Sequence, residues 1–274
     1  NNIYEYVGEN QGSFAPVVQL VAPKKLQVAI VNGTYKPSDK TNIFFEASGS
    51  KYDQNQFSNI DNENNDGFAG KININQTIFK QENAWKLDAF ADTDLISADY
   101  RNIEGLYNVE FKRDWNIDQI PGRQISSDLG DQILMNSGLT LAHQKKGIIN
   151  YQYQFLNFSE GFSGNRHLVN ANLDLNTFII SSNSSFLGTE SNTKTSTFIR
   201  SHNRVTYSMS NSWVGAKLSL ENNEERENST QILTPLSQKF TSYEAFFGVG
   251  DSTNVFAEIG YKNRVNDSIR NLIC

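Results

Sequence analysis

The feature that most constrains this chain is a two-residue alternation of apolar and polar side chains that is kept over long runs. The clearest run is FIRSHNRVTYSMSNSWVGAKLSL, residues 198–220. Ile199 and Tyr207 share one parity, while Arg, His and Thr occupy the other. After the MSN turn the alternation resumes from Val214 to Leu220. Successive side chains of a β-strand point to opposite faces, so this run predicts two long, two-faced strands joined as a hairpin.

The same alternation recurs along most of the chain. Further runs begin at Leu26, Ile43, Ile72, Trp85, Tyr107, Ile149, Val169, Tyr243 and Val255. We find no stretch with the three- and four-residue apolar spacing of a convincing helix. The pattern predicts an all-β fold, an antiparallel up-and-down meander of about 12 to 14 strands. It leaves open whether residues 94–105 hold another strand, or whether the long loop at 116–131 is a functional insertion.

Turn-forming residues separate the expected strands. Short turns are expected at 35–40, 80–83, 144–147 and 250–254. Longer polar links are expected at 53–67, 116–131, 159–166 and 221–238. The five prolines, at positions 16, 23, 37, 121 and 235, all fall outside the expected strands, as pairing on both edges requires.

The chain divides into three parts by this pattern. Residues 1–24 are expected to form an extended arm or the remnant of a preceding segment, 25–270 the meander, and 271–274 a tail. The abrupt first and last phrases favour a piece of a longer protein. Cys274 is the single cysteine, which excludes an intramolecular disulfide and a cysteine-based metal site.

Strand length and face composition favour a transmembrane β-barrel. Many runs alternate for about 9–13 residues, close to the 9–11 that a tilted strand needs to cross a bilayer and longer than most soluble strands. The polar face is too charged for a dry core, whereas a barrel turns such a face to its lumen and the apolar face to lipid. The alternative is a soluble sandwich, whose apolar face packs against a second sheet, or a soluble extended β-sheet.

Aromatic residues near the expected strand ends could form the girdles of a barrel, or could simply favour β structure. They are Trp85, Trp115, Tyr207, Trp213 and Tyr261. The net charge of −6 and the scattered Lys and Arg argue against nucleic acid as a partner. No apolar run approaches the length of about 18 residues that a transmembrane helix needs.

The long-strand meander and two phrases, YEYVGENQGSFAPV (4–17) and EFKRDWN (110–116), resemble parts of large outer-membrane β-barrel proteins of the Bacteroidota. The shared architecture covers most of the chain. The resemblance implies a place in the cell outer membrane, where such proteins serve in nutrient uptake, protein secretion and outer-membrane assembly. It assigns no functional residue.

Catalytic motifs are scarce. His143, His167 and His202 each fall on the polar parity of a different expected strand. They would have to converge with each other, or with Ser and Asp, to make a barrel hydrolase; the simpler interpretation is three solvated lumen histidines. No Gly-x-Ser-x-Gly, His-Glu-x-x-His or phosphate-loop motif occurs, so we expect no enzymatic activity.

One polar stretch resembles the start of a calcium loop. In NENNDG (62–67), Asn62, Asn64 and Asp66 alternate before a glycine, as calcium ligands do. The twelfth position holds Asn73 in place of the bidentate Glu that such a loop needs. An Asn/Asp-rich turn explains the same residues, so calcium is a candidate and no other cofactor is expected.

Together these patterns predict a porin-like outer-membrane β-barrel of a Gram-negative cell. Its role would be passive transport, or scaffolding within an envelope transport, secretion or assembly complex. The expected partners are the lipid bilayer and other envelope proteins. The alternative function is a soluble β-rich cell-surface module that binds sugar or protein.

Overall fold

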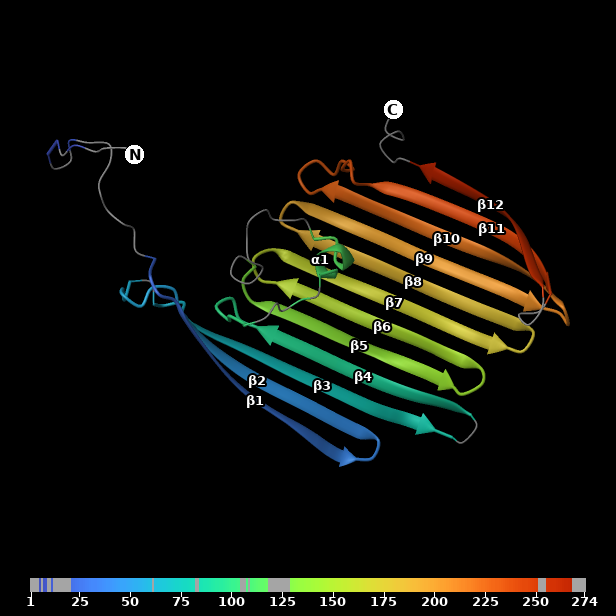
Figure 1. The fold of residues 1–274 in the computed structure, drawn as a ribbon, viewed down its shortest axis with the longest axis horizontal. Coiled ribbons are helices and arrows are strands. Elements are labelled where there is room, and N and C mark those ends of the chain that lie inside the picture. The colour runs from blue at the N-terminus through green and yellow to red at the C-terminus, as the bar shows by residue number, and fades with distance from the viewer. Residues whose placement is uncertain are drawn as a thin grey trace.

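A computed structural model describes residues 5, 7–8, 11, 21–60, 62–81, 84–103, 107, 109–117, 129–250 and 255–267. These residues form one curved sheet of twelve strands (Figure 1). The first six are β1 (Lys25–Ser38), β2 (Thr41–Asp53), β3 (Asp66–Lys80), β4 (Trp85–Ile96), β5 (Gln132–His143) and β6 (Gly147–Phe158). The other six are β7 (Phe162–Leu175), β8 (Phe178–Ser191), β9 (Lys194–Ser208), β10 (Ser212–Glu227), β11 (Gln238–Gly250) and β12 (Phe256–Asp267).

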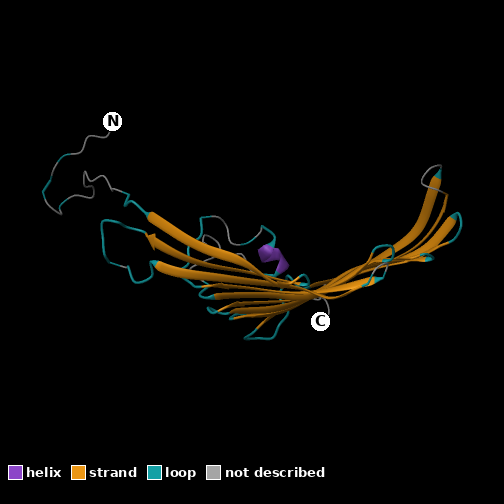
Figure 2. Cartoon of the chain, turned by 90° about the horizontal axis from the view of Figure 1, so that it is seen from below, coloured by secondary structure: helices purple, strands orange, loops and turns teal. Residues whose placement is uncertain are grey.

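Every strand pairs antiparallel with the strand that follows it in sequence. This confirms the predicted up-and-down meander, with twelve strands in the described part of the chain. β1 and β12 are its two edges, and the sheet is an open arc in which they lie far apart (Figures 1 and 2). The predicted arm (1–24) and tail (271–274) fall mostly outside the described residues.

The two ends of the sheet differ in their connections. At one end, which we call the short-turn end, residues 39–40, 144–146, 176–177 and 209–211 reverse the chain. The other end, the long-loop end, carries the links 54–65, 97–131 and 228–237 as well as two tight turns. In most places the predicted short turns lie at the short-turn end and the predicted longer links lie at the long-loop end.

Several predicted boundaries are wrong at the long-loop end. The segment 159–166 is mostly strand, because β7 begins at Phe162, and β10 continues through the polar run to Glu227. Pairing with neighbours on both sides keeps these polar residues extended although their composition suggests a loop. β4 ends at Ile96, and no described residue between 97 and 117 forms a strand, so the open question about 94–105 is settled in favour of a connection.

Pro37 lies inside β1, contrary to the prediction that all prolines lie outside strands. β1 is an edge strand, and its register with β2 shifts between Tyr35 and Ser38. A proline that cannot donate to the ladder is tolerated at such an irregular edge position.

A row of directly paired residues crosses the sheet and shows that the strands are staggered. It begins at Tyr35 and ends at Asp267, and each of its eleven steps joins two directly paired residues of neighbouring strands. Tyr35 lies three residues from Ser38, the short-turn end of β1. Asp267 lies eleven residues from Phe256, the short-turn end of β12. The row therefore shifts by eight residues along the strands over the eleven steps from β1 to β12. At about 3.3 Å per residue and about 4.8 Å per strand, this shift corresponds to a strand tilt of about 27°.

The only helix among the described residues is the single turn α1 (Phe111–Asp114), where a strand starting near Tyr107 was expected. That expectation is wrong because Tyr107, Phe111 and Trp115 also recur every four residues, which places them on one side of a helical turn. The rings of Tyr107 and Phe111 stack at 3.9 Å between centroids, and that of Trp115 follows at 6.3 Å from Phe111.

α1 lies over the concave face of the arc, as the edge-on view shows (Figure 2). The main core cluster is buried between it and the sheet and consists of Phe111, Trp115, Leu156, Phe158 and Leu187. Directly paired residues share a face, so the registers assign each strand residue to this concave face or to the convex face behind it. No described element covers the convex face.

Candidate functional site

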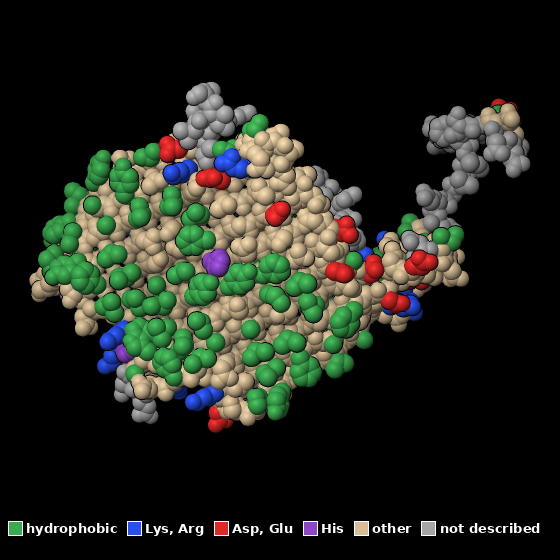
Figure 3. All heavy atoms as spheres, turned by 180° about the vertical axis from the view of Figure 1, so that it is seen from behind, with side chains coloured by type: hydrophobic (Ala, Val, Ile, Leu, Met, Phe, Trp, Pro, Cys, Tyr) green, Lys and Arg blue, Asp and Glu red, His purple; other side chains and the backbone are tan. Residues whose placement is uncertain are grey.

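The convex face is largely apolar between its two ends (Figure 3). Nine charged strand residues point to this face, all within four residues of the long-loop end. They are Lys25, Lys51, Asp53, Asp66, Glu190, Glu224, Arg226, Lys239 and Asp267. Each of the twelve strands keeps at least nine residues without a charge on the convex face, as in Val214–Asn222 of β10. Large apolar side chains in this band, such as Leu218, are about half exposed.

The concave face carries charges along its whole height, and many of them are paired. Lys71 Nζ lies 3.2 Å from Asp94 Oδ1, and Lys217 Nζ lies 2.6 Å from Glu244 Oε1. Phe246, only 3% exposed, lies beneath Lys217, whose Nζ is 5.1 Å from the ring centroid. A charged surface of this kind needs water or a polar partner beside it, since an unsolvated charge is costly.

The middle of the concave face is lined by uncharged amides. They come from β5 to β8 and are Asn136, Asn150, Gln152, Gln154, Asn170, Asn172 and Asn183. Carboxylates flank them on β4, namely Asp88, Asp92 and Asp94. Cations flank them on β9, where Arg200 and Arg204 share the face with His202. The face therefore presents an amide strip between an acidic and a basic side.

The described parts of the connection between β4 and β5 fold inward over this face. The hydroxyls of Tyr100 and Ser48 are hydrogen bonded at 2.8 Å, and both residues are buried. Asp114 Oδ2, at the end of α1, lies 3.5 Å from Arg166 Nη1 of β7. Contacts to β2 and β7 thus hold the described parts of 97–117 against the sheet at two separate places.

Aromatic packing completes the attachment. The Trp115 ring lies so close to Gly164 that a Cβ there would come within 3.1 Å of the indole. The Tyr107 hydroxyl donates a hydrogen bond to Gln132 Oε1. Burial raises the pKa of the Tyr107 phenol, and the Asp94 carboxylate adds to the rise. Tyr107 is therefore a neutral donor at physiological pH.

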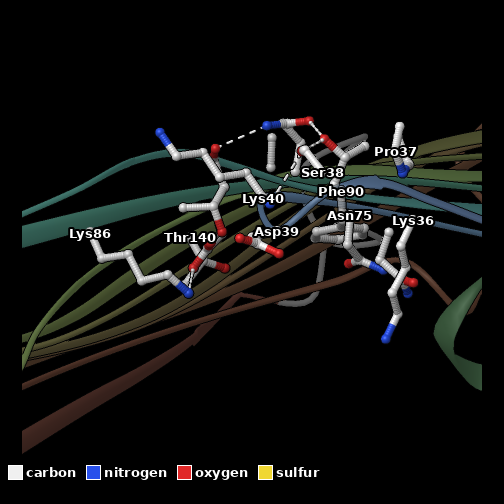
Figure 4. Close-up of a pocket in the computed structure, with 15 residues that line it drawn as sticks. Lys36, Pro37, Ser38, Asp39, Lys40, Asn75, Lys86, Phe90 and Thr140 are labelled. Carbon is white, nitrogen blue, oxygen red and sulfur yellow. Dashed lines mark hydrogen bonds and ion pairs between the residues drawn. The ribbon is translucent and has the colours of Figure 1, made fainter.

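A cavity of about 840 Å³ lies on the concave side at the short-turn end (Figure 4). The β1–β2 turn and the strand ends beside it contribute Lys36, Pro37, Ser38, Asp39, Lys40 and Thr41. The strands behind it contribute Asn42, Asn75, Gln76, Thr77, Lys86, Asp88, Ala89, Phe90 and Thr140. The cavity thus combines lysines, amides, hydroxyls, carboxylates and one aromatic ring, a mixture suited to a polar ligand. Sequence reasoning missed it, because its residues come from five strands.

The three calcium candidates lie where β2 connects to β3. Asn62 Oδ1 accepts a hydrogen bond of 2.9 Å from Asn65 Nδ2. Asp66, the first residue of β3, has Oδ1 at 3.5 Å from Lys51 Nζ. Asn64 lies exposed between them. A calcium ion would have to displace the Asn65 amide and the Lys51 ammonium, and its binding stays a prediction.

The histidines are not brought together. His202 lies on the concave face as predicted, but His143 and His167 lie on the convex face, so their predicted parity is wrong. His143 pairs with Trp85 across β4 and β5, and His167 Nδ1 is 2.9 Å from the Tyr151 hydroxyl. The reason is that both parities of β5 and β7 carry polar residues, so composition alone does not identify their faces. Among the described residues, no group of three or more His, Cys, Asp and Glu is placed to hold a metal ion.

The predicted girdle residues divide between the faces. Trp85 and Tyr207 lie on the convex face near the short-turn end, and Tyr261 lies on the same face of β12. Trp213 instead points to the concave side, where its Nε1 donates to Glu258 Oε2 at 2.8 Å. Trp115 is buried beneath α1. The last two therefore cannot belong to a girdle on the convex face.

No protein-family description matches the sequence, and no curated protein matches it either. In the described part of the chain, no helix is long and apolar enough to cross a membrane.

Proposed function

We propose that the sheet is the wall of a transmembrane β-barrel in the outer membrane of a Gram-negative cell, with the concave face toward an aqueous lumen. The observation that carries the proposal is the charge-free band on the convex side of all twelve strands. A face in contact with water would have no reason to exclude charges from the same band of all twelve strands. Lipid supplies that reason, because charges are costly only at the depth of the hydrocarbon.

The height of the band matches a bilayer. Nine residues at about 3.3 Å each, tilted by about 27°, rise about 25 Å. The apolar band of outer-membrane barrels is also about 25 Å tall. Trp85 and Tyr207 lie at the short-turn border of this band, the depth at which interfacial aromatics are found.

The same proposal requires that the two free edges of the sheet be paired in the membrane. An unpaired strand edge leaves backbone N–H and C=O groups without partners, which hydrocarbon does not tolerate. In the membrane the edges of β1 and β12 are therefore paired, either with each other or with further strands. Either arrangement keeps the antiparallel order, because β1 and β12 run in opposite directions along the sheet.

The inward connection gives the lumen a specific shape. Its described residues cover part of the concave face and narrow any passage beside it. This arrangement supports a role in passive transport, or as a scaffold in an envelope transport, secretion or assembly complex with other envelope proteins as partners. One of the two phrases that resemble Bacteroidota outer-membrane barrels, residues 110–116, includes α1, so part of the resemblance falls on this inward element.

Gel mobility of the protein with and without boiling, after extraction from membranes, tests the proposal. A closed membrane barrel needs detergent for extraction, and its folded form migrates differently from the boiled form. A protein that is soluble without detergent and migrates identically in both lanes contradicts the proposal. That result favours the soluble surface module that binds sugar or protein.

A further inference from the structure

The charges of the short-turn cavity are not balanced. Lys86 Nζ lies 2.7 Å from Asp88 Oδ2, so this pair is neutral. Lys36 at the end of β1 and the turn residues Asp39 and Lys40 complete the charged lining, and neither of these two lysine ammonium groups has a carboxylate partner among the described residues. The cavity therefore has one net positive charge. Lys36 and Lys86 lie on opposite sides of the cavity, and the Lys36 side chain points away from Lys86 (Figure 4). An anionic group on a ligand would complement this charge.

One polar atom in the cavity lacks a hydrogen-bond partner. Asn42 Oδ1 is shielded from solvent and accepts no hydrogen bond within the described chain. Neighbouring hydroxyls do not meet this need, since Thr41 Oγ1 donates to Gln76 Oε1 at 2.7 Å and Thr140 Oγ1 donates to a β6 amide at 2.8 Å. A buried acceptor without a donor is unfavourable. Asn42 lines the cavity, so a rotation of its terminal amide toward the cavity would let a ligand hydroxyl supply the missing hydrogen bond.

The remaining wall is suited to a small ring. Phe90 contributes an aromatic side chain to the lining, against which the C–H face of a sugar can pack. The volume of about 840 Å³ lies within the range of about 300–1,000 Å³ that is usual for small-molecule sites.

We propose that this cavity binds a hydroxylated anion of monosaccharide size, a sugar acid or a sugar phosphate. The anionic group contacts Lys36 and Lys40, a ring hydroxyl donates to Asn42 Oδ1, and the ring packs on Phe90. The inference goes beyond the membrane proposal and does not depend on it, because every lining residue belongs to β1–β5 and the β1–β2 turn.

Calorimetric titration of the folded protein in detergent solution tests the assignment with D-glucuronate, D-glucose and acetate as probes. Glucuronate should bind best, because glucose lacks the anionic group and acetate lacks the hydroxyls. Lys36→Gln and Lys40→Gln should each weaken glucuronate binding about two- to fivefold, as loss of an exposed ion pair does, and leave glucose unchanged. Lys145→Gln is the matched control, since Lys145 lies in the β5–β6 turn at the same end but outside the cavity.

Asn42→Ala separates the second contact from the first. It should weaken glucuronate and glucose but not acetate, and it breaks no hydrogen bond at Oδ1. Equal affinity for glucuronate and acetate, no response to either lysine substitution, or no binding by correctly folded protein would each overturn the proposal. None of these results bears on the membrane proposal, because the gel assay does not involve the cavity.

Discussion

A charge placed in the middle of the convex band distinguishes lipid from water at that face. Leu218 is four residues from Val214 and four from Asn222, the limits of the band on β10. At about 3.3 Å per residue and a tilt of about 27°, its Cα lies about 12 Å from either border. An arginine at the bilayer midplane of a barrel costs about 2–4 kcal/mol, and near the interface about 0–1 kcal/mol. Leu218→Arg should therefore lower the free energy of unfolding in vesicles by about 2–4 kcal/mol.

Two matched variants isolate the cause. Ser219→Arg places the same side chain at nearly the same depth but on the concave face, and Val214→Arg places it on the convex face at the border. Each should cost less than about 1 kcal/mol. The assay is equilibrium urea unfolding of the vesicle-inserted protein, followed by tryptophan fluorescence and by the shift in gel mobility.

The pattern of the three values decides the outcome. Leu218 is half exposed, so in water its replacement by arginine should change stability by only about 0.5 kcal/mol. Similar small effects for Leu218→Arg and Ser219→Arg would refute a lipid-facing band. A large effect of Leu218→Arg in protein that stays soluble without detergent would instead indicate a second sheet packed on this face.

Three further predictions concern the inward connection and the sheet. Trp115→Ala removes a buried ring from the core cluster at a cost of about 3–5 kcal/mol, so hydrogen exchange in 109–117 should become faster while β9 and β10 stay protected. Because the pKa of Tyr107 is raised in the folded state, its contribution to stability is fully present below about pH 10 and is lost as the pH rises further. A titration followed by phenolate absorbance should show one tyrosine that ionises at higher pH than the others, and Tyr107→Phe should remove it. Gly138→Ala should destabilise the sheet by about 1–3 kcal/mol in urea unfolding, because a Cβ there would come within 2.5 Å of the Tyr151 backbone oxygen and 2.6 Å of the Phe90 ring.

The overall fold could be predicted from the sequence because alternation and strand pairing point to the same structure. In β9 and β10 the apolar parity is unbroken from Val205 to Tyr207 and from Val214 to Leu220, and the register places both sets on the convex face. α1 could not be identified in this way. Tyr107 and Phe111 fit a period of two as well as a period of four, and only the packing of Trp115 on the sheet selects the helix.

The candidate site was less accessible to sequence reasoning than the fold. The cavity places the turn residue Lys40 near Thr140, and this neighbourhood depends on the registers of four successive strand pairs. The faces of His143 and His167 also depend on register, because a shift by one residue exchanges the two faces of a strand. A local hydropathy pattern does not identify the two faces of a strand when apolar and polar residues occur on both parities.

β8 shows why polar residues on the convex face are compatible with the membrane proposal. Its outward residues include Ser182 and Ser184, which break the apolar alternation and hide the strand in the sequence. Ser182 Oγ donates to Asn203 Oδ1 at 2.6 Å, Asn203 Nδ2 donates to Ser201 Oγ at 2.8 Å, and the hydroxyls of Ser184 and Ser201 are 2.8 Å apart. The four side chains therefore satisfy much of one another's hydrogen-bonding capacity across β8 and β9. Polar groups are tolerated in hydrocarbon when neighbouring side chains supply their partners, so this cluster needs no water on the convex side.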